Sequence, residues 1–152
     1  MSITIAAPEG LPYVGAALLS SAFLVAGQLI IVTGRRKAAG IRHPQLYAEQ
    51  AEAEKSVHAY RFNCAQRAHL NTLEYLPLLY LTTCLTATKL PILAASLCGT
   101  WVFARVFYTR GYVSDNPEKR VWGAESSIVV LAGLLVSATY SVGTAVLAQL
   151  GY

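Results

Sequence analysis

Two long stretches of this chain contain no charged side chain, and they constrain its fold more than any other feature. No Asp, Glu, Lys or Arg occurs from Gly10 to Gly34, or from Ser126 to the C-terminus. A membrane-spanning helix needs about 20 mostly apolar residues, so each stretch is long enough to form one. Two further charge-free stretches, 75–88 and 90–104, are shorter. Each must include adjacent polar residues to reach the length of a membrane span.

The composition points the same way. A soluble domain carries about 25% charged residues, whereas in these 152 residues 13% are charged and 55% are apolar. The mean hydropathy is +0.44. We therefore expect a single all-α domain, an integral membrane four-helix bundle that occupies residues 1–152. Its spans are predicted near 11–34, 62–88, 91–113 and 117–148.

The placement of Lys and Arg predicts the orientation. Nine of them fall in the two connections expected on one side: Arg35, Arg36, Lys37, Arg42, Lys55, Arg61, Arg110, Lys119 and Arg120. Only Lys89 lies on the other side. Because cytosolic loops are rich in Lys and Arg, we expect both connections in the cytosol and both termini in the lumen. The first span should remain uncleaved, since a signal peptide carries its basic residues before the apolar core.

Local signals refine this outline. Asn116, Pro117 and Glu118 form a helix start, because Asn caps, Pro suits the first helical position and Glu favours the positive helix end. Pro77 lies inside the second span and should kink it. In the first connection, the segment AEQAEAEKSV is expected to form a short surface helix.

Several noticeable residues are assigned to packing. The cysteines have no metal-type spacing, so we expect no metal site and small buried side chains; they are Cys64, Cys84 and Cys98. Three large aromatics are expected in packing or at the membrane interface, namely Trp101, Trp122 and Tyr140. Glu125 is given no catalytic role. It either pairs with an arginine, Arg105 or Arg120, or is a satisfied structural carboxylate.

The second span carries a polar face. Arg67, Asn71 and Glu74 are spaced i, i+4 and i+7, which places them on one side of a helix, and Tyr75 flanks them. Charges inside a span cost at least about 2.5 kcal/mol and usually face a bundle interior or a wet cavity. This face is therefore a candidate binding site.

The third span carries a matching face. Arg105, Tyr108 and Tyr112 are spaced i, i+3 and i+7. Two such faces on adjacent spans predict one cavity near the cytosolic side, suited to a small zwitterionic anion, because Arg binds carboxylates bidentately. The alternative is that Arg67 and Glu74 neutralise each other and the polar residues serve helix packing.

These residues also carry a resemblance. The runs FNCAQRAHLNTLEYLP, FARVFYTRGY and PEKR resemble the superfamily of membrane-associated proteins in eicosanoid and glutathione metabolism (MAPEG), and most closely its microsomal glutathione S-transferase 3 group. The resemblance implies a four-helix protomer and a homotrimer in the membrane of the endoplasmic reticulum or nuclear envelope. It also implies that glutathione binds between subunits at the cytosolic side.

The resemblance assigns glutathione-binding roles residue by residue. They fall on Arg36, Arg67, His69, Asn71, Glu74, Tyr75, Arg105, Tyr108, Arg110 and Tyr112. His69 stands where leukotriene-forming members have glutamine, and Arg110 is at a contact position of variable type. Lys37 is the rival of Arg36 at the basic exit of the first span, where both also suit a topology anchor.

The resemblance places the catalytic arginine near the start of the fourth span. Arg120 fits best, with Lys119 as the fallback, and its role is to stabilise the glutathione thiolate. A thiol has a pKa of about 8.5 and attacks as the thiolate. Lowering that pKa by two units requires about 2.7 kcal/mol, which one guanidinium and the positive end of a helix can supply. The alternative is that Arg120 binds no ligand and only anchors the fourth span at the membrane interface.

The resemblance thus implies a membrane glutathione transferase with glutathione peroxidase activity, using glutathione as co-substrate and no metal. Its other partners are a lipophilic electrophile or lipid hydroperoxide and membrane lipid, with no nucleic acid. The alternative from the same superfamily is a non-catalytic lipid-binding scaffold. A small structural or channel protein is a third reading, but it leaves the buried arginines unexplained.

Overall fold

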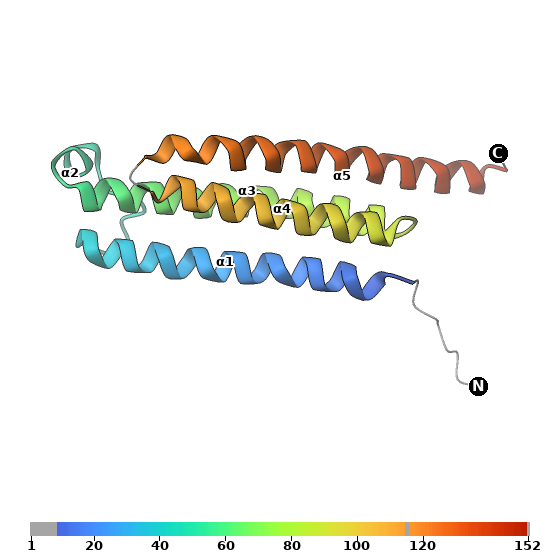
Figure 1. The fold of residues 1–152 in the computed structure, drawn as a ribbon, viewed down its shortest axis with the longest axis horizontal. Coiled ribbons are helices and arrows are strands. Elements are labelled where there is room, and N and C mark those ends of the chain that lie inside the picture. Colours follow the sequence, from blue (N-terminus) through green and yellow to red (C-terminus); the bar gives the residue numbers. More distant parts are fainter. Residues whose placement is uncertain (1–8, 115, 152) are drawn as a thin grey trace, which may run out of the picture.

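The computed structural model describes residues 9–114 and 116–151, in which four long helices run side by side (Figure 1). They are α1 (Leu11–Ala39), α3 (Val57–Ala87), α4 (Pro91–Tyr112) and α5 (Arg120–Gln149). A short helix, α2 (Gln50–Lys55), follows α1, and a 3-10 turn, η1 (Pro117–Lys119), precedes α5. The all-α membrane bundle predicted from the sequence is confirmed, and so is the short surface helix.

Three segments are long and apolar enough to cross a membrane: α1, α4 and residues 117–149. The polar side chains in the first half of α3, such as Arg67 and Glu74, lower its hydropathy. This helix crosses nevertheless, because it connects the end of α1 to the start of α4, and these lie at opposite ends of the bundle (Figure 1). The chain is therefore a multi-pass membrane protein.

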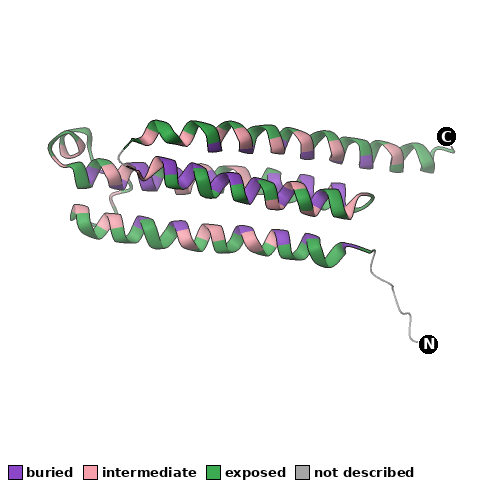
Figure 2. Cartoon of the chain, viewed as in Figure 1, coloured by how far each residue is buried: buried purple, intermediate pink, exposed green. Residues whose placement is uncertain are grey.

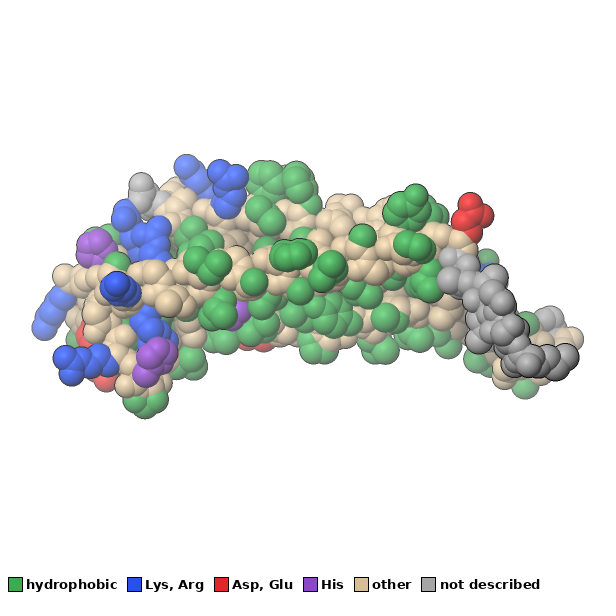
Figure 3. All heavy atoms as spheres, turned by 90° about the horizontal axis from the view of Figure 1, so that it is seen from below, with side chains coloured by type: hydrophobic (Ala, Val, Ile, Leu, Met, Phe, Trp, Pro, Cys, Tyr) green, Lys and Arg blue, Asp and Glu red, His purple; other side chains and the backbone are tan. Residues whose placement is uncertain are grey.

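The surface is typical of a protein in lipid. Large apolar side chains point outward along the bundle, among them Phe23, Ile30 and Val129, which are at least 70% exposed. An exposed apolar surface of this extent indicates contact with a membrane. Lys and Arg gather at the end that carries α2 and the connection between α4 and α5, which we call the basic end (Figure 3).

The helix ends differ from the predicted spans for local reasons. α1 continues to Ala39, past the predicted end at 34, and stops at Gly40, whose φ of 69° suits glycine. Its last turn holds Arg36 and Lys37, which favour the negative end of a helix. α3 begins at Val57, earlier than predicted, because the Ser56 side chain accepts a hydrogen bond from the Ala59 N–H.

The predicted helix start after the third span is present. The Asn116 side chain accepts a hydrogen bond from the Glu118 N–H, and Pro117 occupies the first position. This first turn is 3-10 rather than α-helical, so α5 itself begins at Arg120. The second span is one helix that continues through Pro77.

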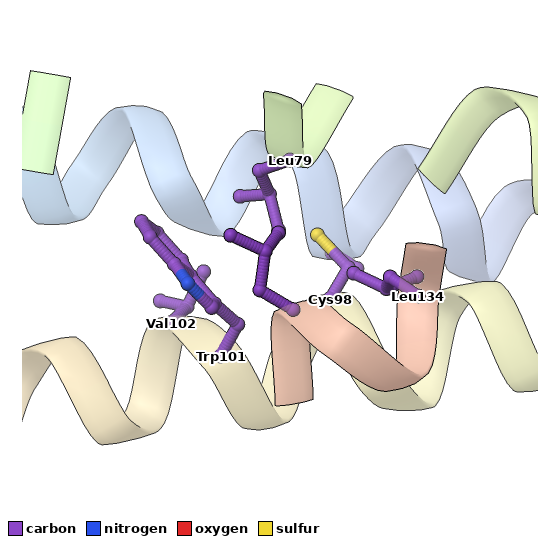
Figure 4. Close-up of a cluster of buried hydrophobic side chains, with 7 residues drawn as sticks. Leu79, Cys98, Trp101, Val102 and Leu134 are labelled. Atoms are coloured by element: carbon purple, nitrogen blue, oxygen red, sulfur yellow. The ribbon is translucent and has the colours of Figure 1, made fainter. Parts of the chain in front are cut away.

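The core lies between a central pair of helices, α3 and α4, and the two outer helices, α1 and α5, each of which packs against both. Buried residues line the inward faces (Figure 2). A cluster of buried hydrophobic residues joins all four long helices, and Figure 4 labels Leu79, Cys98, Trp101, Val102 and Leu134 within it.

The cysteine prediction was partly wrong. Cys64 and Cys98 are buried, as expected, whereas Cys84 is exposed on the outer surface of α3. Cys84 is one position after Thr83, which is fully buried. One step along a helix turns the side chain by about 100° and carries it away from the core.

Two glycines allow α4 and α5 to approach at the basic end. A Cβ on Gly111 would lie 2.6 Å from the backbone nitrogen of Arg120, and a Cβ on Gly123 would overlap the backbone of Tyr108. Real Cβ atoms are not found this close to another backbone. The glycines therefore fix where α5 starts relative to α4.

Candidate functional site

A cavity of about 510 Å³ opens at the basic end, between α3 and the connection from α4 to α5. We call it the basic cavity. Its size is within the range of small-molecule sites. The residues that matter most for its chemistry are Tyr60, Cys64 and Arg67 from α3, Tyr112 from α4, Glu118 from η1, and Arg120 at the start of α5.

Arg120 is held in place at the cavity by three contacts. Its Nη1 donates to the Pro117 carbonyl at 3.0 Å and to the Glu118 carboxylate at 3.2 Å. Its guanidinium lies 4.9 Å from the centre of the Tyr112 ring. As the first residue of α5 it is a cation at the positive end of a helix, an arrangement that costs about 0.3–1 kcal/mol. An anion in the cavity would be stabilised by both charges.

Lys119, the fallback for the catalytic role, is exposed and is not part of the cavity lining. Glu125 is also exposed, and the carboxylate that pairs with Arg120 is that of Glu118. The geometry therefore favours Arg120 over Lys119 as the residue that meets a ligand in this cavity.

The polar face of α3 forms a chain of contacts next to the cavity. Arg67 pairs with Glu74 at 3.2 Å, and the Asn71 amide donates to the same carboxylate at 3.3 Å. The Arg67 and Glu74 side chains are 48% and 54% exposed. A pair this exposed contributes little to packing within the protomer, so both groups are available to a ligand or to another chain.

Arg105 lies beneath this face, only 1% exposed. Its Nη2 donates to the Asn71 amide oxygen at 2.8 Å and to the Thr72 hydroxyl at 2.9 Å. The guanidinium also stacks 3.9 Å from the centre of the Tyr108 ring. Arg105 is too deeply buried to line the cavity, but it fixes which side of the Asn71 amide faces Glu74.

The predicted meeting of the two polar faces is therefore present, in a different form from the expected single cavity. Arg67 and Tyr112 line the basic cavity, whereas Asn71 and Arg105 are joined to each other behind it. Tyr108 is 5% exposed and packs edge-on against Tyr112 at 5.5 Å. The centre of the Tyr75 ring lies 5.6 Å from the Arg105 guanidinium.

Three other candidates lie apart from the cavity within one chain. Arg36 donates to the Gln45 carbonyl at 2.6 Å and stacks on Phe62, which secures the segment after α1. His69 is two positions after Arg67 and so faces another side of α3. Arg110 is two positions from both Tyr108 and Tyr112, so it faces another side of α4. It lines a groove between α1 and α4.

Sequence reasoning missed a buried network behind the site. Gln28 of α1 donates to Thr72 of α3 at 2.9 Å and to Thr109 of α4 at 2.7 Å. Thr72 also accepts from Arg105. The available signal was Gln28 itself, the one amide side chain in the charge-free stretch from 10 to 34.

Sequence reasoning also missed the cavity wall other than Arg67, Tyr112 and Arg120, and two of the missed residues are Tyr60 and Cys64. They precede Arg67 at the same i, i+4, i+7 spacing that defined the polar face. This spacing did not mark them as site residues, because neither side chain is charged. Within the described ranges, no three His, Cys, Asp or Glu side chains lie close enough together to hold a metal ion.

Comparison with known proteins adds one finding. A family model described as MAPEG family matches residues 14–140. The match takes in most of the four long helices and all the candidate site residues discussed above.

Proposed function

Because the chain belongs to the MAPEG family, we propose that it is a membrane-bound glutathione transferase of the microsomal glutathione S-transferase 3 group, with glutathione peroxidase activity. Proteins of this family bind glutathione and lipid substrates. The observation that carries the proposal is that Arg67, Tyr112 and Arg120 line one cavity at the basic end.

The chemistry of the cavity suits glutathione, which carries two carboxylates, an ammonium group and a thiol. Arg67 can bind a carboxylate through two parallel hydrogen bonds, and Glu74, which pairs with Arg67 next to the cavity, can accept from the ammonium group. Tyr60 and Tyr112 offer phenol hydroxyls in the cavity wall. Arg120 and the positive end of α5 place two sources of positive charge on the same side.

In this mechanism Arg120 stabilises the thiolate over the thiol and so raises the fraction that reacts at neutral pH. The thiolate attacks an electrophilic carbon and forms a thioether, while the leaving group departs or an epoxide opens. With a lipid hydroperoxide it attacks the terminal oxygen and releases the lipid alcohol. A second glutathione then converts the resulting sulfenic acid to the disulfide and water.

We place this activity in the endoplasmic reticulum or nuclear envelope, in a homotrimer with the basic end in the cytosol. The clustering of Lys and Arg at that end (Figure 3) supports the orientation, and the half-exposed polar face of α3 leaves polar groups available to a neighbouring subunit. The organelle and the trimer follow from the family resemblance. Residues 1–8 and 152, the outermost parts of the predicted luminal termini, lie outside the described residues.

The orientation predicts the result of a glycosylation experiment. An acceptor site added after Tyr152 should be modified in the lumen, and one inserted in α2 near Ala51 should remain unmodified, because α2 lies at the basic end. Mobility shifts after treatment with a glycosidase report both. The reverse pattern would place the basic cavity in the lumen and overturn the orientation.

Glutathione binding tests the proposed function. Arg67→Ala and Glu74→Gln should each weaken binding by about 1–3 kcal/mol, because each removes a charge-assisted hydrogen bond. Isothermal titration of the detergent-purified protein measures the change. Arg42→Ala is the matched control, because Arg42 is an exposed cation of the basic end that does not line the cavity.

Two outcomes would count against the proposal. If the wild-type protein does not bind glutathione, the lipid-binding scaffold is the better account. If Arg67→Ala misassembles while its folded fraction keeps full affinity, the α3 pair serves helix packing instead. When glutathione binds, a panel of an aromatic halide, a lipid hydroperoxide and a fatty epoxide separates transferase from peroxidase activity.

A further inference from the structure

A second hollow lies between α1 and α4, whereas the basic cavity lies between α3 and the connection from α4 to α5. Its volume is about 400 Å³, and we call it the membrane groove. Most of its lining is apolar, with Phe23, Leu24, Val102 and Val106 among its residues. It is an open depression along the membrane-spanning part of the bundle, where lipid is the surrounding medium.

The groove has a polar end and an apolar end. Gln28, Thr109 and Arg110 form the polar end, where Gln28 Nε2 donates to the Thr109 hydroxyl at 2.7 Å. This end is nearer the basic end of the bundle, because α1 finishes and α4 finishes there (Figure 1). The apolar end extends from there toward the middle of the bundle.

The length of the groove matches one leaflet. Its lining on α1 runs from Ser20 to Ile31, which at 1.5 Å per residue spans about 16 Å. Half of a bilayer hydrocarbon core is about 15 Å. The groove therefore has the dimensions of one acyl chain whose headgroup lies at the basic side.

One exposed cation at the polar end indicates the headgroup. Arg110 is exposed, so its guanidinium can reach a phosphate at the membrane surface. Gln28 is only 2% exposed, and in the described part of the chain its Oε1 has no hydrogen-bond partner, since its two contacts are made through Nε2. This oxygen is itself enclosed, so it makes this end of the groove polar without contacting the headgroup directly.

We propose that the membrane groove binds an anionic phospholipid from the leaflet at the basic end. Its phosphate lies at Arg110, and one acyl chain lies along the apolar lining between α1 and α4. The site does not depend on the proposed reaction with glutathione, and it gives Arg110 a role outside the basic cavity.

The test uses native mass spectrometry of the full chain, without glutathione, in micelles that contain phosphatidylserine or phosphatidylcholine with the same acyl chains. The wild-type protein should retain phosphatidylserine preferentially. Arg110→Ala should lower that binding by about fivefold, the effect of one cation near a membrane surface. Arg42→Ala, which removes a cation of the same end outside the groove, should not.

A second pair of variants tests the acyl chain. A Cβ on Gly27, which lines the groove, meets no atom within 4 Å, and the same holds for Gly15 outside it. Among the described residues, a Cβ at either position on α1 therefore meets no clash, and both substitutions start from open space. Gly27→Leu should fill the groove and reduce retention of both lipids, whereas Gly15→Leu should bind them like the wild type.

Three outcomes would overturn the proposal. Equal losses of phosphatidylserine binding in Arg110→Ala and Arg42→Ala would show that anionic lipid is attracted to the basic end in general. Unchanged lipid binding in Gly27→Leu would place the lipid elsewhere. A change in oligomer mass in Gly27→Leu, with lipid binding intact, would make the groove a contact with a second copy of the chain.

Discussion

Replacing Arg120 by alanine is expected to leave glutathione binding nearly intact while turnover at neutral pH falls by about 10–100-fold. Binding is kept because the carboxylates of glutathione are held elsewhere, with Arg67 the leading candidate. Turnover falls because the thiol pKa in the site rises when the guanidinium is lost, and each unit lowers the thiolate fraction about tenfold below the pKa. Steady-state kinetics at pH 7 and 9 measure the effect.

The loss of activity in Arg120→Ala should depend on pH. The wild-type site lowers the thiol pKa, so its activity is already high at neutral pH. The variant thiol returns toward about 8.5, so activity should recover partly as the pH approaches 9. Lys119→Ala is the matched control, because Lys119 is adjacent but exposed and outside the cavity. Loss of activity in Lys119→Ala alone would transfer the role to that residue.

Gly111→Ala is expected to lower turnover by a similar factor, because it changes the position of Arg120 without removing its guanidinium. The added Cβ would lie 2.6 Å from the backbone nitrogen of Arg120, so the start of α5 must move away from the end of α4. Displacing a catalytic group by about 1 Å costs roughly 100-fold in rate, and overpacking costs about 1–3 kcal/mol of stability. Turnover and thermal unfolding in detergent are measured together.

Gly99→Ala is the control on the same helix. A Cβ on Gly99 meets no atom within 4 Å, so this variant should keep both the activity and the stability of the wild type. If Gly111→Ala behaves like Gly99→Ala, the close approach of α4 and α5 does not set the position of Arg120. A loss of stability without a change in turnover of the folded protein would lead to the same conclusion.

Much of the fold could be predicted, because charge-free stretches determine where a chain can cross a membrane. The boundaries were less accurate, since they depend on local caps. α1 continues beyond its apolar part until Gly40 ends it, and Ser56 starts α3 before the apolar run. The 3-10 turn before Arg120 was also missed, because both turn types begin with the same Asn-Pro-Glu signal.

The candidate site was predictable where charge and helical spacing coincide. The pattern of Arg67, Asn71 and Glu74 places these groups on one face, and the structure joins them. Spacing alone does not report depth, however. Arg105 is buried and contacts Asn71 from behind, while the uncharged Tyr60 forms part of the cavity wall. Depth depends on how the helices pack, which the i, i+4 pattern of a single helix does not contain.

The most direct test of the central claim is a titration of the glutathione thiolate in the site. The ultraviolet absorbance of the thiolate is followed across pH after glutathione is added to the wild-type protein and to Arg120→Ala. The account predicts that bound glutathione ionises well below the ordinary thiol pKa of about 8.5 in the wild type, and near that value in Arg120→Ala. Identical titrations, with normal turnover in the variant, would contradict it and leave Arg120 as an anchor at the membrane interface.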